Sequence, residues 1–185
     1  MTGKIVEICC GSYYDAKQAA LGGAERIELN SALMLGGLTP TESTLRMVKE
    51  AFPALKVVAM VRPRGAGFCY TEEEFQVMER ECESLLRAGA DGIREAGGEA
   101  VFHRAFDCSK NPFAAMEQLI TMGVARVLTS GLKPKAVEGR EMLKKLQADY
   151  GKEIQILAGS GVNADNAAEL MAYTGLHQVH SSCKA

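Results

Sequence analysis

Three ionisable side chains of different chemistry, His103, Arg104 and Asp107, fall within five consecutive positions. They follow the apolar pair Val101-Phe102, and Asn111-Pro112 then offers a cap and a first-turn proline for a helix. An apolar strand that turns polar just before a helix begins is typical of a βα unit. The segment therefore predicts a site that combines an imidazole, a guanidinium and a carboxylate at the end of a strand.

Strand-like and helix-like segments alternate along the whole chain. The expected strands cover residues 5–9, 26–30, 56–62, 99–104, 126–129, 154–158 and 178–181, with an eighth starting at Gly92-Ile93. The expected helices cover 14–21, 41–51, 112–122, 137–150 and 163–174, and a further long one follows Thr71 and Glu74, which form a capping box. This order predicts a parallel sheet. Eight strands favour a TIM-type (β/α)8 barrel over a doubly wound open sheet.

Glycine recurs between a helix and the next strand. Gly23, Gly89, Gly123 and Gly175 all occupy this place. A glycine just after a helix supplies the left-handed residue that closes it, so these positions support the βα repeat.

The barrel pattern is interrupted in two places. A strand starts at Gly92-Ile93, residues 94–98 resemble the end of a helix, and too few residues remain before His103 for a parallel crossover. The chain also stops at Ala185, directly after the last strand, and is shorter than the roughly 200 residues of small barrels. We therefore expect one (β/α)8 domain over residues 1–185 that lacks a segment after Ile93 and another after Ala185.

Composition and charge narrow the class of protein. A net charge of −2 gives no basis for binding nucleic acid or an anionic membrane. No apolar run approaches the roughly 18 residues of a membrane span, and no secretory signal precedes the first strand. Six cysteines without disulfide-like spacing suggest reduced thiols. We expect a cytoplasmic protein with neither nucleic acid nor membrane as a partner.

Side-chain alternation predicts which residues enter the barrel. In the second strand Ile27 and Leu29 are expected to face the helices, which leaves Arg26, Glu28 and Asn30 facing inward. The same rule places Glu7 and Cys9 inward in the first strand, with Cys10 starting the loop. Other strands end in Arg62, His103, Thr129-Ser130 and His180. Because barrel sites lie at the carboxyl ends of the strands, these groups are expected to share one rim.

This set of charges has two interpretations. As an active site, Glu7 or Glu28 would be the general base and His103 the acid or electrophile, with Asp107 beside it. Alternatively, Glu7, Glu28, Arg26 and Arg62 form an internal ion network that only fills the barrel. The first interpretation is favoured because a lumen is filled at lower cost by Val, Ile and Leu.

The loops predict a small anionic or phosphorylated ligand. Residues 158–162 form a glycine-rich turn after the seventh strand, where barrels often bind phosphate through backbone N–H groups. Alternatively, those glycines serve only a tight turn. Arg62-Pro63-Arg64 places two guanidiniums on one stiff loop, a geometry suited to an anion. The candidate ligand-binding residues are Arg26, Asn30, Arg62, Arg64, Arg104, Thr129, Ser130, Gly159, Ser160, Gly161 and His180.

Seven motifs carry a family resemblance that runs in order along the chain. They are Glu7-Ile8-Cys9, Arg26-Ile27-Glu28-Leu29, Gly36-Gly37-Leu38-Thr39-Pro40, Met60-Val61-Arg62-Pro63-Arg64-Gly65, Phe102-His103-Arg104-Ala105-Phe106-Asp107, Leu128-Thr129-Ser130-Gly131 and Val179-His180-Ser181-Ser182. Together they resemble the CutC family of copper homeostasis proteins. The resemblance implies a cytoplasmic barrel that forms a homo-oligomer, a dimer or tetramer, linked to copper tolerance and proposed to bind Cu(I). Some members carry a second cysteine where this chain has Asn30.

Copper would need soft ligands, and the candidate metal ligands are Cys9 and Cys10. Asn30 is a poor ligand for Cu(I), which weakens a two-thiolate site built on Cys9. Alternatively, these cysteines are small apolar fillers. The competing function is a TIM-barrel enzyme of lyase, isomerase or hydrolase type that acts on a small anion at the strand ends. A third interpretation is an oligomer that binds a metabolite without turnover.

Overall fold

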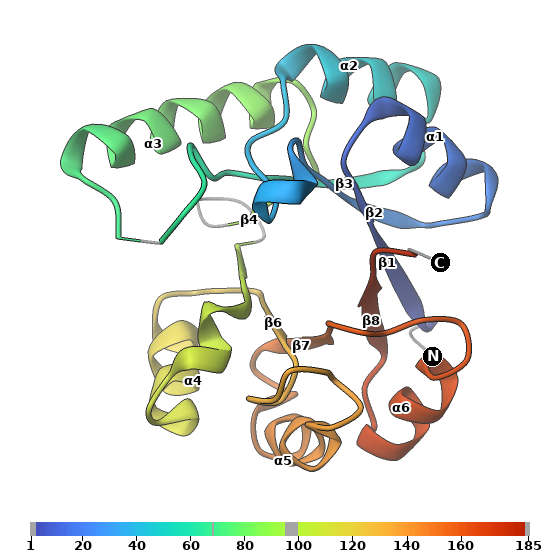
Figure 1. Cartoon of the computed structure of the whole chain (residues 1–185), viewed down its shortest axis with the longest axis vertical. Helices are drawn as coiled ribbons and strands as arrows, with labels where there is room; N and C mark the ends of the chain where they lie inside the picture. The colour runs from blue at the N-terminus through green and yellow to red at the C-terminus, as the bar shows by residue number, and fades with distance from the viewer. Residues whose placement is uncertain (1–2, 68, 95–99, 184–185) are drawn as a thin grey trace. The chain divides into compact units, whose positions relative to one another are not determined.

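The computed structural model describes residues 3–67, 69–94 and 100–183 of the 185-residue chain. Its contacts divide the chain into an N-terminal unit, Ile8–Glu99, and a C-terminal unit, Met1–Glu7 with Ala100–Ala185. Strands and helices alternate within the described residues in the order of the predicted (β/α)8 fold (Figure 1). That residues 1–185 form a single domain stays a prediction.

The N-terminal unit begins within strand β1 (Ile5–Cys10), which crosses the boundary between the units. It continues with α1 (Tyr13–Leu21), β2 (Arg26–Leu29), the 3-10 turn η1 (Leu33–Leu35), α2 (Glu42–Ala51), β3 (Lys56–Met60), α3 (Glu72–Arg87) and β4 (Gly92–Arg94). The strand order is β4-β3-β2-β1, and β2, β3 and β4 pair in parallel with Arg26 opposite Lys56 and Val58 opposite Gly92. Helices α1 and α2 lie on one side of these strands in Figure 1.

The C-terminal unit contains the other half of the alternation. Its elements are β5 (Val101–Phe102), the 3-10 turn η2 (Arg104–Cys108), α4 (Pro112–Thr121), β6 (Arg126–Thr129), α5 (Arg140–Tyr150), β7 (Gln155–Ala158), α6 (Ala167–Thr174) and β8 (Gln178–Ser181). The strand order is β1-β8-β7-β6-β5, and the pairs from β5 to β8 are parallel.

Each unit has its own hydrophobic cluster between strands and helices. In the N-terminal unit Ile27 and Leu29 pack in one cluster with Leu45 and Val48 of α2, as the alternation predicts. Cys10 lies in the same cluster, so it ends β1 rather than starting the loop. In the C-terminal unit the cluster includes Val127, Ile156, Val179, Leu143 and Leu170.

The predicted local signals are present. Thr71 and Glu74 form a capping box at α3, and Asn111 caps α4 with Pro112 in its first turn. The four glycines between a helix and the next strand have positive φ angles of 86° at Gly23, 99° at Gly89, 74° at Gly123 and 76° at Gly175.

Two helices start later than predicted. Asn163 accepts hydrogen bonds at Oδ1 from the N–H groups of Asp165 and Asn166, a local turn that competes with the helix, and α6 begins only at Ala167. Similarly, Ala136 donates its N–H to the carbonyl of Ser160, which keeps the chain before α5 in a loop until Arg140.

Strand β4 ends at Arg94 and β5 starts at Val101, so fewer residues separate them in the sequence than a parallel crossover needs. Arg94 itself belongs to β4, and the rest of the helix end predicted at 94–98 lies outside the described residues. None of the helices in the described ranges is long and apolar enough to span a bilayer.

Candidate functional site

A buried carboxylate and a histidine are paired in the C-terminal unit. Glu7 of β1 is 1% exposed, and its Oε1 lies 2.9 Å from Nδ1 of His180 on β8. Because an ionised carboxylate only accepts hydrogen bonds, Nδ1 of His180 carries the proton in this pair. The guanidinium of Arg126 on β6 lies 3.8 Å from the second oxygen of Glu7, so the two buried groups form an ion pair.

Arg126 belongs to a polar layer of hydrogen-bonded side chains, which the sequence analysis did not predict. Its Nε donates to Oε1 of Gln155, and the side-chain amide of Gln178 donates to the same oxygen at 2.9 Å. These residues start strands β6, β7 and β8. The alternation used for the second strand would have found them, because Val127, Ile156 and Val179 face the helices and leave their neighbours facing the other way.

Asp107 is a carboxylate with several hydrogen-bond donors around it. It accepts from Thr129 Oγ1 at 2.5 Å and from the N–H groups of Ser130 and Leu132 at 3.1 Å. Arg104 donates to it through Nε at 2.9 Å. Burial favours the neutral acid, but these four partners outweigh it and hold the pKa of Asp107 below its ordinary value. The carboxylate therefore joins η2 to the loop after β6.

Arg104 and His103, the other two predicted site residues of the segment 103–107, also form hydrogen bonds. Arg104 donates through Nη2 to Ser130 Oγ at 2.9 Å, and its side chain is 42% exposed. His103 is 8% exposed and accepts at Nδ1 from the N–H of Ala105, so it caps the turn η2. A neutral His103 therefore carries its proton on Nε2.

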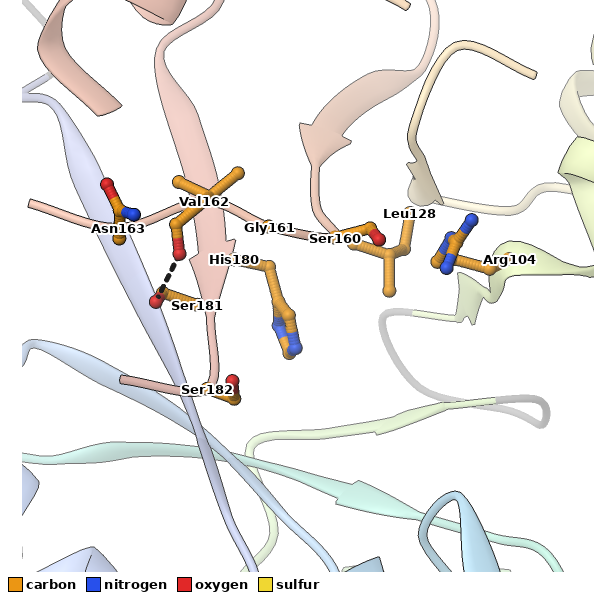
Figure 2. Close-up of a pocket in the computed structure, with 9 residues that line it drawn as sticks. All are labelled: Arg104, Leu128, Ser160, Gly161, Val162, Asn163, His180, Ser181 and Ser182. Carbon is orange, nitrogen blue, oxygen red and sulfur yellow. Dashed lines mark hydrogen bonds between the residues drawn. The ribbon is translucent and has the colours of Figure 1, made fainter. Parts of the chain in front are cut away.

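A cavity of about 320 Å³ lies at the carboxyl ends of β7 and β8. Its lining includes four predicted ligand-binding residues, Arg104, Ser160, Gly161 and His180. Ser181 and Ser182, which were not predicted as site residues, also line it. Figure 2 shows the side chains of Arg104 and His180 on either side of Leu128 in that view, and the hydrogen bond from Ser181 Oγ to the carbonyl of Val162. The structure thus brings the β7 loop, η2 and β8 to one cavity.

In the N-terminal unit, Cys9 lies beside Asn30. The amide nitrogen of Asn30 is 3.5 Å from the sulfur of Cys9 and 3.4 Å from the carbonyl of Glu28. Glu28 and Asn30 are each 2% exposed, and Cys9 is partly buried. The Asn30 amide thus donates to a sulfur that is a soft metal ligand once it is deprotonated.

The other described cysteines of this unit are placed differently. The sulfur of Cys10 lies in the helix-packed core, 3.6 Å from the carbonyl of Ile8, and Cys82 is in the same cluster. Cys69 is exposed. Neighbouring strand residues point to opposite faces, so Cys9 and Cys10 do not present their sulfurs to one side. The residues of this unit therefore fit Cu(I) through one thiolate, Cys9.

Arg62 and Arg64 hold loops together. Arg62 donates to the carbonyls of Leu35, Gly37 and Ala66 at 3.0, 3.1 and 2.8 Å, which links the loops after β2 and β3. Arg64 pairs with Glu74 at the start of α3, and this guanidinium together with the N–H of Thr71 lowers the pKa of Glu74. Arg26, also a predicted ligand-binding residue, is buried at the start of β2.

Within each unit, several of the predicted residues are in contact with one another. In the C-terminal unit, Glu7 contacts His180. Asp107 contacts Arg104, Thr129 and Ser130. Ser160 and Gly161 line the cavity. In the N-terminal unit, Cys9 and Asn30 are in contact, whereas Arg62 and Arg64 contact mainly loop carbonyls and Glu74. The single rim, and the role of each residue, stay predictions.

The fold defines a TIM-type barrel protein, and sequence comparison identifies its family. A sequence model of the CutC family matches residues 4–99 and 93–185, so the chain belongs to the CutC family. The CutC family protein of Treponema denticola is 40% identical over 196 residues, covering 95% of this chain and 79% of that one. That of Vibrio vulnificus is 37% identical over 203 residues, covering 97% and 81%.

The fold agrees with a solved structure. The crystal structure of a Streptococcus agalactiae protein named for copper homeostasis, CutC, matches with a TM-score of 0.91 at 24% identity, covering 97% of this chain and 98% of that one. The alignment with the T. denticola relative spans 196 residues, more than the 185 of this chain, so that relative has internal residues with no counterpart here. The two family matches meet at residues 93–99, which agrees with a segment missing after Ile93.

Proposed function

We propose that this protein acts in copper homeostasis in the cytoplasm, as a homo-oligomer, by holding Cu(I) through the Cys9 thiolate. Membership of the CutC family carries the proposal, since the S. agalactiae relative is named for copper homeostasis. Cys9 supports it as the ligand, because a soft ion prefers thiolate and the Asn30 amide lies 3.5 Å from its sulfur. When bound, Cu(I) would be the cargo whose free concentration the protein lowers.

A Cu(I) titration under anaerobic conditions tests this proposal. A competing chromogenic chelator reports the metal taken up by the wild-type chain, by Cys9→Ser and by Cys69→Ser. Cys69 is an exposed cysteine of the same unit and serves as the matched control. We expect stoichiometric binding that Cys9→Ser abolishes and Cys69→Ser keeps. Binding that survives Cys9→Ser contradicts the assignment, and light scattering on the same samples reports the oligomer.

A second candidate function is catalysis on a small anion. The observation that favours it is the Glu7–His180 pair, in which a buried carboxylate orients an imidazole that lines the cavity together with Arg104. A carboxylate that fixes a histidine tautomer is a common arrangement for proton transfer. In this candidate His180 or Glu7 moves the proton and Arg104 holds the negative charge, while the roles of Glu28 and His103 stay as predicted.

Complementation of a deletion strain separates the two functions. For the catalytic function we expect Glu7→Gln and Glu28→Gln to fail to restore the strain, because each amide keeps the shape but loses the charge. Glu153→Gln, at an exposed position before β7, is the control. Full rescue of every phenotype by both interior variants would exclude catalysis. Failure of Cys9→Ser with rescue by both glutamate variants would support copper.

A further inference from the structure

The loop after β6 already binds an anion, and that anion is a side chain of the protein. Ser130 and Leu132 donate their N–H groups to the Asp107 carboxylate at 3.1 Å. Between them, Gly131 donates its N–H to Thr129 Oγ1, which in turn donates to the same carboxylate. Gly131 and Leu132 have φ angles of 70° and 64°. Two left-handed residues in succession therefore gather the donors of this loop around one negative charge.

The loop after β7 repeats that backbone in register. Thr129 of β6 is opposite Ala158 of β7, so Gly131 and Leu132 correspond to Ser160 and Gly161. Ser160 and Gly161 have φ angles of 81° and 70°, close to those of their counterparts. By this register the N–H of Gly161 takes the place of the Leu132 N–H, which donates to Asp107 in the neighbouring loop.

The carbonyl groups of the β7 loop are all directed to other partners. Those of Ser160, Gly161 and Val162 accept from Ala136 N–H, Asn166 Nδ2 and Ser181 Oγ respectively. In a planar trans peptide the N–H of the next residue points opposite to the carbonyl. These anchors therefore direct the N–H groups of Gly161 and Val162 to the other side of the loop. Within the described part of the chain, neither N–H donates to a protein acceptor.

The cavity next to this loop has a guanidinium in its wall. Arg104 lines it together with the imidazole of His180. Asp107 accepts a hydrogen bond from Arg104, so the charge of this guanidinium is partly balanced. Backbone N–H groups therefore supply much of the attraction for an anion, as they do around Asp107.

We propose that the 160–162 loop, with Arg104, binds the phosphoryl group of a small phosphorylated ligand. The donors come from a loop backbone and from η2, and a tetrahedral oxyanion presents oxygens in several directions, whereas a carboxylate presents two in one plane. This assignment rests on the second proposed function, binding of a small anion at this cavity, and names the chemical class of that anion.

Titration of the intact chain with inorganic phosphate tests the assignment. Amide NMR shifts locate the anion, and we expect the largest shifts at Ser160, Gly161 and Val162. Arg104→Gln should weaken phosphate binding about tenfold or more, the loss expected for one charge-assisted hydrogen bond. Arg140→Gln should leave it unchanged, since Arg140 on α5 has a similar exposure of 44% against 42% but does not line this cavity.

Parallel titrations with acetate and chloride distinguish failure of the phosphoryl assignment from failure of anion binding as such. Shifts at the 160–162 loop with acetate but not with phosphate would overturn the phosphoryl assignment and leave the anion-binding function standing. The absence of loop shifts with every anion would overturn both. Phosphate shifts located elsewhere, or equal binding by Arg104→Gln and the wild type, would also overturn the assignment. If Arg104→Gln does not fold, the location of the wild-type shifts still decides.

Discussion

Asp107 joins two segments of the C-terminal unit through one carboxylate. Its partners come from η2 through Arg104 and from the loop after β6 through Thr129, Ser130 and Leu132. The sequence pointed to Asp107 as a catalytic residue because it is close to His103. Its contacts hold Arg104, which lines the cavity, and a catalytic role of Asp107 stays a prediction.

The charge of Asp107 should make the stability difference between the wild type and Asp107→Asn depend on pH. Its folded pKa lies below the unfolded value, so its contribution is present above about pH 4 and is lost as the pH falls through the folded pKa. We expect Asp107→Asn to lower the free energy of unfolding at pH 7 by about 2 kcal/mol. Urea unfolding from pH 7 to pH 3 should show this difference shrinking in acid. A stability difference between the two proteins that stays constant with pH would contradict an ionised Asp107 carboxylate.

Gly131 is required because a side chain there would collide with the backbone, and not only because of its positive φ angle. A Cβ there would lie 2.2 Å from the carbonyl oxygen of Gly139, whereas Gly123, with φ of 74° against 70°, has nothing within 4 Å. We expect Gly123→Ala to cost about 1 kcal/mol for its backbone conformation alone. Gly131→Ala should cost clearly more, since backbone must move. Equal losses in thermal unfolding would show that the close approach is relieved without cost.

At the scale of the elements, helix α3 is tied to the loop that precedes it. Glu74 completes the capping box with Thr71 and also accepts from Arg64 Nη2 at 3.0 Å. The aromatic ring of Tyr70 lies 5.3 Å from the Arg64 guanidinium. The helix start and the loop after β3 therefore share one set of partners, and binding of an anion by Arg64 stays a prediction.

Removal of the cap hydroxyl should destabilise this element alone. We expect Thr71→Ala to lower the free energy of unfolding by about 1 kcal/mol, because the N–H of Glu74 loses its acceptor. Thr71→Ser keeps the hydroxyl and should stay close to the wild type in urea unfolding. A loss of equal size in both variants would point to the methyl group and away from the cap.

Local sequence signals predicted these elements well because each depends on a few neighbouring residues. The capping box at Thr71, the proline start at Pro112 and the left-handed glycines such as Gly175 are all present. The start of α6 was wrong because the Asn163 side chain formed its own turn. The polar layer of Arg126, Gln155 and Gln178 was missed because the three residues meet only once the strands pair.

At the scale of the whole molecule, each unit has its own core. Leu45 is fully buried in the cluster of the N-terminal unit, and Leu143 is fully buried in the cluster of the C-terminal unit. Truncation of a core residue in one unit should therefore raise hydrogen–deuterium exchange mainly at the amides of that unit.

Two matched core truncations test this division. Leu45→Ala and Leu143→Ala should each lower stability by roughly 2–5 kcal/mol. Hydrogen–deuterium exchange should rise mainly in β2, β3 and α2 for the first variant, and in β6, β7 and α5 for the second. An equal rise across both units for either variant would show that the two cores open together.

The sequence by itself determined the alternation of strands and helices, the inward parity of residues such as Glu28 and the family, because periodicity, capping and motifs are local or linear features. Only the tertiary structure decided which polar groups touch. It paired Glu7 with His180, brought Asp107 of η2 into contact with the loop after β6 and set the β7 loop in register beside that loop. Hydrogen bonds between strands distant in sequence depend on register and loop conformation, and neither is encoded in any single stretch of the chain.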